Sequence, residues 1–101
     1  QLLPVQAQDI AWFQSRHETV TLVTQAGQRY LVDYTLEQLE QLLDPGQFFR
    51  LNRQFIAQLR AVQRLHPWFN GKLKLDLQPA PADEVIVSRE KAAAVKNWLE
   101  G

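Results

Sequence analysis

The sequence predicts a mainly β domain with two short helices, assembled from small antiparallel sheets. Short runs of β-branched and aromatic residues recur along the chain, and several alternate polar with apolar side chains, the pattern of half-buried strands. Glycine-containing turns separate some neighbouring runs, as in β-hairpins. Apolar residues recur at helical spacing in only two segments, and no β–α–β alternation is present, so a parallel sheet is not expected.

Length and composition limit the domain organisation. The chain has 101 residues, of which 46% are hydrophobic, which suits one domain over residues 1–101 with a single modest core. It begins at Gln1 and has no methionine, so we expect a piece of a longer protein. No apolar run reaches the roughly eighteen residues of a membrane helix, and no signal peptide opens the chain, so a cytoplasmic domain without a membrane partner is expected.

The first part of the chain predicts three strands. Bulky apolar side chains in residues 9–14 indicate the first strand, and residues 15–17 a turn. Residues 18–24 alternate with period two and indicate the second strand. Residues 25–27 contain a glycine and suit a hairpin turn, after which residues 28–34 return as the third strand.

A helix is predicted to follow at once. Thr35 suits its N-cap, and Gln38 stands three residues later, as a capping box requires. Residues 44–46 (Asp-Pro-Gly) end the helix. Glu37 and Glu40 fall on its exposed face, so the acidic stretch around them needs no functional explanation. The inner face carries four leucines, namely Leu36, Leu39, Leu42 and Leu43.

Polar residues interrupt the next apolar stretch. Residues 48–51 and 55–57 predict short buried strands on either side of Asn52-Arg53-Gln54. Apolar anchors on both sides would hold this polar tip rigidly against the core. A further strand is predicted over residues 61–69.

The last part of the chain predicts a hairpin, a strand and a helix. Asn70-Gly71 is a strong signal for a two-residue hairpin turn, and the strict alternation of residues 72–77 turns their leucines inward. Residues 78–83 contain two prolines and are predicted to form a loop. Residues 85–87 form a strand, and Ser88 caps a helix that runs to about residue 100 with Ala92, Val95 and Leu99 inward.

The charge is balanced overall but unevenly distributed. Eleven basic and eleven acidic residues give a net charge of zero. No acid lies between residues 47 and 74, where six basic residues occur. Such a stretch suits either a solvated strand face or a surface that attracts a polyanion, because local potential steers a polyanion more than total charge does.

Nothing in the sequence asks for catalysis. The absence of cysteine excludes disulfides and thiolate zinc sites. The two histidines, His17 and His66, lie far apart and match no metal-ligand spacing. No nucleophile elbow, P-loop or dinucleotide fingerprint is present. We therefore expect no enzyme activity, no metal and no cofactor.

Two places have side chains suited to nucleic acid. Asn, Arg and Gln read base edges well, so Asn52, Arg53 and Gln54 form either a groove probe or an ordinary exposed turn. Ser88 and Arg89 stand at a helix N-terminus, where backbone N–H groups favour a phosphate. The alternative for this pair is a cap followed by a solvated arginine.

The chain resembles the LytTR family of DNA-binding domains. The similarity rests on Asp9-Ile10 at the first strand, on the run Phe49-Arg50-Leu51-Asn52-Arg53-Gln54-Phe55-Ile56-Ala57-Gln58-Leu59, and on Val87-Ser88-Arg89. It extends from about Pro4 to Leu99. Asn52, Gln54 and Gln58 depart from the residues most frequent in the family at their positions, although all three remain polar.

The resemblance implies an elongated assembly of small β-sheets whose loops enter successive major grooves. It implies base contacts by Asn52, Arg53 and Arg89 and a third contact in the turn after the first strand. Candidates for that third contact are Arg16, His17 and Glu18. Arg50, Arg60 and Lys74 are phosphate candidates on their charge alone.

The resemblance also implies the wider role. It indicates sequence-specific binding of double-stranded DNA and transcription regulation, as the effector domain of a bacterial two-component response regulator. An N-terminal receiver domain and a homodimer on repeated half-sites are the implied partners. The alternative from the charge pattern is a protein-interaction module whose basic side docks an acidic partner.

Overall fold

The predicted fold class is confirmed. The computed structural model describes residues 5–101. Gln1, where the chain begins, and Pro4, where the resemblance begins, therefore lie outside the described residues. The described elements are β1 (Ile10–Arg16), β2 (Thr19–Thr24), β3 (Arg29–Val32), α1 (Leu36–Leu42), β4 (Phe48–Arg50), β5 (Phe55–Gln58), β6 (Val62–Pro67), β7 (Leu73–Leu77), β8 (Val85–Val87) and α2 (Arg89–Glu100), with short 3₁₀ turns η1 (Ala7–Asp9), η2 (Leu59–Ala61) and η3 (Phe69–Gly71).

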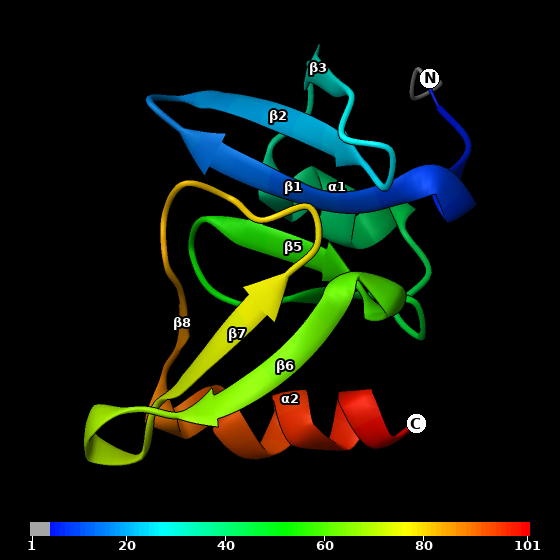
Figure 1. Cartoon of the computed structure of the whole chain (residues 1–101). Coiled ribbons are helices and arrows are strands. Elements are labelled where there is room, and N and C mark those ends of the chain that lie inside the picture. Colours follow the sequence, from blue (N-terminus) through cyan, green and yellow to red (C-terminus); the bar gives the residue numbers. More distant parts are fainter. Residues whose placement is uncertain (1–4) are drawn as a thin grey trace.

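The strands form two antiparallel sheets. The larger sheet has the order β3-β2-β1-β5-β4, and the smaller has the order β6-β7-β8. Figure 1 shows the smaller sheet below the larger one, with α2 beneath it and α1 behind β1. Every strand pair in the described residues is antiparallel, as expected from the short connections.

Strand β1 lies at the centre of the larger sheet and is buried on both faces. A register shift between Ile10 and Trp12 marks a bulge in its pairing with β2. The bulge sends Ala11 and Trp12 to the same core, whereas Ile10 and Phe13 face the other. Four consecutive apolar residues can therefore be fully buried in a strand whose side chains would otherwise alternate.

Two hydrophobic clusters cover the two faces of the larger sheet. One contains Phe13, Leu22 and Ile56 with the buried leucines of α1. The other joins the opposite face of the sheet to β7, β8 and Val95 of α2. The larger sheet is thus the middle layer of the fold, in line with the layered architecture of small domains.

The helix caps confirm the sequence-based predictions. Thr35 Oγ1 accepts a hydrogen bond from Gln38 N at 3.0 Å, and Gln38 Oε1 accepts one from Thr35 N at 2.9 Å, completing the capping box. Ser88 Oγ accepts from Lys91 N at 3.3 Å at the start of α2. In α1, Leu36 and Leu39 are buried, but Leu42 is 57% exposed, so the buried face of the helix is narrower than predicted.

The predicted turn at residues 15–17 is wrong in position. Strand β1 continues through Arg16, and His17 and Glu18 form the turn with φ of 51° and 64°. Two positive φ values suit a two-residue hairpin because that turn matches the right-handed twist of its strands. Two other predictions were too long: the third strand covers only Arg29–Val32, and Ala61 lies in η2 rather than in a strand.

The described chain is only moderately elongated. Its principal extents are 38 × 29 × 24 Å and its radius of gyration is 12.8 Å. A globular chain of 100 residues has a radius of gyration of about 13 Å. The elongation implied by the resemblance is therefore modest in this chain.

Candidate nucleic-acid interface

Several connections project along one edge of the molecule, on the left in Figure 1. We call residues 16–18, 51–54, 69–72 and 86–91 the loop edge. Hydrogen bonds link its parts: Ser15 N donates to Gln54 O at 2.8 Å, and Asn52 Nδ2 donates to Ile86 O at 2.8 Å. The loop edge therefore brings together most of the residues that the sequence singled out.

The side chain of Asn52 is occupied within the protein. Its Oδ1 accepts hydrogen bonds from Gln54 N at 2.8 Å and from Phe55 N at 2.9 Å, while Nδ2 reaches across to Ile86 of β8. An amide whose oxygen and nitrogen both have protein partners is poorly placed to read a base. In this structure Asn52 holds the 51–54 loop and ties the two sheets together, and its base contact stays a prediction.

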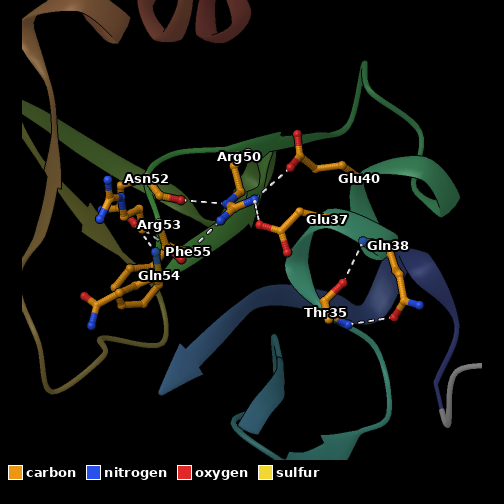
Figure 2. Close-up of polar contacts among 9 residues, drawn as sticks. All are labelled: Thr35, Glu37, Gln38, Glu40, Arg50, Asn52, Arg53, Gln54 and Phe55. Carbon is orange, nitrogen blue, oxygen red and sulfur yellow. Dashed lines mark hydrogen bonds and ion pairs between the residues drawn. The ribbon is translucent and has the colours of Figure 1, made fainter. Parts of the chain in front are cut away.

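Arg50 has a similar internal role. Its Nη1 lies 2.8 Å from Glu40 Oε2 and 3.2 Å from Glu37 Oε2, and its Nε donates to Asn52 O at 2.7 Å (Figure 2). Its Nη2 donates to Arg53 O at 3.2 Å. A guanidinium with this many partners is poorly placed to neutralise a phosphate, which is what its charge had suggested. The acidic face of α1, which seemed to need no role, supplies two of these partners.

Arg53 and Gln54 behave differently. Both are exposed, and in the part of the chain that the structure describes neither side chain makes a hydrogen bond or an ion pair. Their backbone is nevertheless held, because Arg53 O, Gln54 N and Gln54 O all have protein partners. Two free polar side chains therefore project from a restrained loop.

Ser88 and Arg89 lie beside the 51–54 loop, since Ser88 lines a hollow together with Arg53. The Arg89 side chain is 72% exposed, and its head is 3.8 Å from Glu90 Oε2, a weak surface pair. Its aliphatic stem lies against Gly71 of the η3 turn. The Asn70-Gly71 turn predicted from the sequence thus supports Arg89.

Two basic residues of the loop edge were not among the predicted site residues. Lys72 and Lys91 line one hollow together with Arg53 and Ser88, and Glu40 is the one carboxylate among the described residues lining it. In the sequence, Lys72 is marked only by its place in the basic stretch of residues 47–74. Lys91 had no signal in the sequence, because only the packing of α2 beside the 51–54 loop brings it there.

The turn after the first strand is also exposed. Arg16, His17 and Glu18 all face solvent, and the Arg16 guanidinium lies 3.8 Å from Asp83 Oδ2. Asp83 in turn accepts a hydrogen bond from Gln14 Nε2 at 2.7 Å. The turn therefore presents one cation, Arg16, and one anion, Glu18, to a ligand. Asp83 partly neutralises the charge of Arg16.

Lys74 and Arg60 do not join the loop edge. Lys74 is half-buried on β7, 3.5 Å from Glu84 Oε2 and 5.1 Å from the centre of the Trp68 ring. Arg60 lies in η2, at the opposite side of Figure 1, and its Nη2 donates to Gln8 O at 3.0 Å. Arg60 therefore lies apart from the projecting tips, whereas Lys74 lies opposite Ile86 with its charge already partnered by Glu84.

The histidines make no candidate catalytic arrangement. His66 Nε2 lies 2.7 Å from Asp76 Oδ2 on neighbouring strands of the smaller sheet. This hydrogen bond, with the nearby positive charges of His66, Lys74 and Arg64, lowers the pKa of Asp76 below its ordinary value. His17 lies in the exposed turn, and its side chain makes no hydrogen bond or ion pair among the described residues. No helix in residues 5–101 is long and apolar enough to span a membrane.

Comparison with known proteins gives the family. A sequence model of the LytTr DNA-binding domain (LytTR) matches residues 1–100. The transcriptional regulatory protein YpdB of Escherichia coli is 31% identical over 88 residues, 87% of this chain and 36% of that protein. The sensory transduction protein LytT of Bacillus anthracis is 32% identical over 95 residues, 94% of this chain and 37% of that protein.

A solved structure agrees on the fold. A LytTr DNA-binding domain from Bacillus cereus superposes with a TM-score of 0.81, covering 98% of this chain and 88% of that one, at 19% identity. The chain spans about a third of the length of the curated regulators it matches. Because the family model covers nearly the whole sequence, the chain belongs to the LytTr DNA-binding domain family.

Proposed function

We propose that this domain recognises specific double-stranded DNA sequences by placing the tips of its loop edge in successive major grooves. The observation that carries the proposal is the 51–54 loop, from which Arg53 and Gln54 project without protein partners among the described residues while the backbone beneath them is hydrogen-bonded. A restrained probe loses little conformational entropy when it binds.

The chemistry of the tips supports base reading. Arginine can bond O6 and N7 of guanine together, and glutamine can bond N6 and N7 of adenine. Arg89 provides a second exposed arginine on the loop edge. The longest dimension of the domain is 38 Å, and one turn of B-DNA is about 34 Å, so the domain as a whole is long enough to face two neighbouring grooves.

Phosphate contacts would come from other residues of the same edge. We assign them to Lys72, Lys91 and Arg16, and to the N-terminus of α2 at Ser88, where backbone N–H groups favour an anion. Lys74 can add a weaker contribution because Glu84 already partners it. Such contacts fix register and supply much of the affinity, whereas base contacts choose the sequence.

The wider role is that of an effector domain in a two-component response regulator. The curated relatives are about two and a half times as long as this chain, which leaves room in them for a further domain such as an N-terminal receiver. We propose the same arrangement for the protein to which this chain belongs. Pairing of two copies on repeated half-sites would double the number of bases read.

The alternative is a protein-interaction module that docks an acidic partner against Arg53, Lys72 and Lys91. Both proposals predict salt-dependent binding, so salt alone does not separate them. Only a DNA reader has a reason to prefer one duplex over another of equal charge.

The test is selection from random duplexes on the purified domain at moderate salt, followed by sequencing of the bound pool. Enrichment of a definite motif, lost in the double variant Arg53→Ala/Gln54→Ala, supports the DNA reader. A bound pool without enrichment contradicts it and favours the interaction module.

A further inference from the structure

We infer that the acidic face of α1 takes part in sequence recognition: Glu37 and Glu40 hold Arg50, and Arg50 holds the 51–54 loop in its reading position. These three residues would then be positioning residues rather than DNA contacts. The inference rests on the proposed function of this loop and extends it to a helix that does not project from the loop edge.

The geometry carries the inference. Figure 2 shows the Arg50 guanidinium between the α1 carboxylates on one side and the loop carbonyls on the other. Nη1 faces Glu40 and Glu37 at 2.8 and 3.2 Å. Nε and Nη2 donate to the carbonyls of Asn52 and Arg53 at 2.7 and 3.2 Å. The Arg50 side chain is only 16% exposed, whereas Glu40 and Glu37 are 42% and 73% exposed, so the pair with Glu40 is the better shielded from water.

Only an arginine can make this connection. Its guanidinium is planar and presents five donors in fixed directions, so contacts on two sides fix the orientation of the group. A lysine ammonium is a point charge with three donors and cannot bridge two carboxylates and two carbonyls together. The two carboxylates thereby determine where the loop carbonyls must lie.

The effect on the loop is direct. Arg50 bonds the carbonyls of residues 52 and 53, which are the backbone groups directly before and at the proposed base reader Arg53. Loss of these bonds would leave the loop held mainly by Asn52 and by the contact of Gln54 O with Ser15 N. A base contact requires exact placement of a side chain, whereas contact with any duplex through its phosphates does not.

Neutralising the two glutamates separates this inference from simple electrostatics. Removing two negative charges near a bound polyanion should strengthen binding to every duplex. The positioning role predicts the opposite for the preferred duplex, because the reading loop loses its order. The sign of the change is therefore diagnostic.

The experiment compares Glu37→Gln/Glu40→Gln with the charge-matched control Asp33→Asn/Glu100→Gln, whose residues make no hydrogen bond or ion pair with Arg50 in the described structure. Affinities are measured for the preferred duplex and for a scrambled duplex at one salt concentration. We expect the ratio of the two affinities to fall about five- to tenfold in the first variant and to stay unchanged in the control. An unchanged ratio in both variants overturns the inference.

A second readout needs no DNA, so that failure of the positioning role is distinguishable from failure of the DNA-binding proposal. Hydrogen exchange of the Gln54 and Phe55 amides should accelerate in Glu37→Gln/Glu40→Gln and in Arg50→Lys, while core amides of β1 keep their rates. Unchanged exchange at residues 54 and 55 in both variants overturns the inference even if no preferred duplex exists.

Discussion

The aliphatic stem of Arg89 lies so close over Gly71 that a β-carbon on Gly71 would come within 2.9 Å of Arg89 Cγ and Cδ. Gly71 also has a φ of +77°, in the left-handed region. A turn in the β6–β7 hairpin thus sets the course of an arginine at the start of α2. This relationship leads to the first prediction.

Gly71→Ala should weaken DNA binding because the new methyl group displaces Arg89. The left-handed backbone also predicts a loss of stability of about 1–2 kcal/mol. Gly27→Ala is the matched control, since Gly27 has a φ of +91° but nothing within 4 Å of an added β-carbon. Both variants should lose similar free energy of unfolding, and only Gly71→Ala should lose affinity. Equal affinities of the two variants for the preferred duplex would count against Arg89 as a contact.

Arg53→Ala should relax specificity at one base position, with a loss of about 1–3 kcal/mol of discrimination if its contact with guanine is bidentate. Arg60→Ala removes the same charge at the other side of the molecule, where the side chain bonds Gln8 O. It should leave the base preference unchanged. Binding of a panel of singly substituted duplexes measures both, and an Arg53→Ala profile identical to wild type would remove Arg53 from the readers.

Asn52→Ala should reduce stability as well as specificity. It leaves the exposed amide of Gln54 and the part-buried amide of Phe55 without their acceptor, and a buried polar group that loses its partner costs about 1–3 kcal/mol. Asn52→Asp keeps the acceptor for both amides but sets a carboxylate oxygen against Ile86 O, so it should weaken the link between the sheets and leave the bonds within the loop in place. Chemical denaturation measures both. If Asn52→Ala lost DNA affinity at full stability, Asn52 would be the base reader that the sequence suggested.

Lys72→Ala and Lys91→Ala should weaken binding to all duplexes alike. Each phosphate contact contributes about 0.9 to the slope of log affinity against log salt, so each variant should have a slope shallower by about that amount. Lys74→Ala should change the slope less, because Lys74 is half-buried beside Glu84. A slope that is the same in Lys91→Ala and wild type would exclude Lys91 as a phosphate contact.

The Glu37 carboxyl should titrate below its ordinary pKa of 4.5, because its backbone hydrogen bond and then the Arg50 guanidinium favour the ionised form. A pKa lowered by folding contributes stability that is present above the unfolded pKa and lost as the pH falls through the folded value. The contribution of ionised Glu37 to the free energy of unfolding is therefore complete at neutral pH and is lost as the pH falls below 4.5. Carboxyl NMR titration measures this, and Arg50→Met should raise the midpoint only in part, since the backbone hydrogen bond remains.

Local patterns predicted the fold well. The Thr35 capping box, the alternating leucines of residues 73–77 and the Asn70-Gly71 turn depend on neighbours in sequence, and all three are present. The bulge in β1 was not predictable, because it comes from packing two cores against one strand.

The candidate site was harder to predict because charge and residue type do not reveal partners. Arg50 meets Glu37 and Glu40 only after β4 has docked beside α1. Asn52 bonds Ile86, which is 34 residues away. Arg60 follows β5 to the far end of the sheet, although it is close in sequence to Arg53. A sequence-based list of site residues therefore mixed side chains that hold the loop with side chains that project from it.

The division between holding and projecting residues has a consequence for how this domain can diverge. Arg53 and Gln54 bear little on the packing of the domain, because their side chains have no partners among the described residues, whereas Arg50 and Asn52 carry the hydrogen bonds beneath them. Substitutions of Arg53 and Gln54 should therefore change the free energy of unfolding very little. If these positions read bases as proposed, duplicated copies of such a gene would acquire new DNA targets by single substitutions there, while selection for a folded chain preserves Arg50 and Asn52.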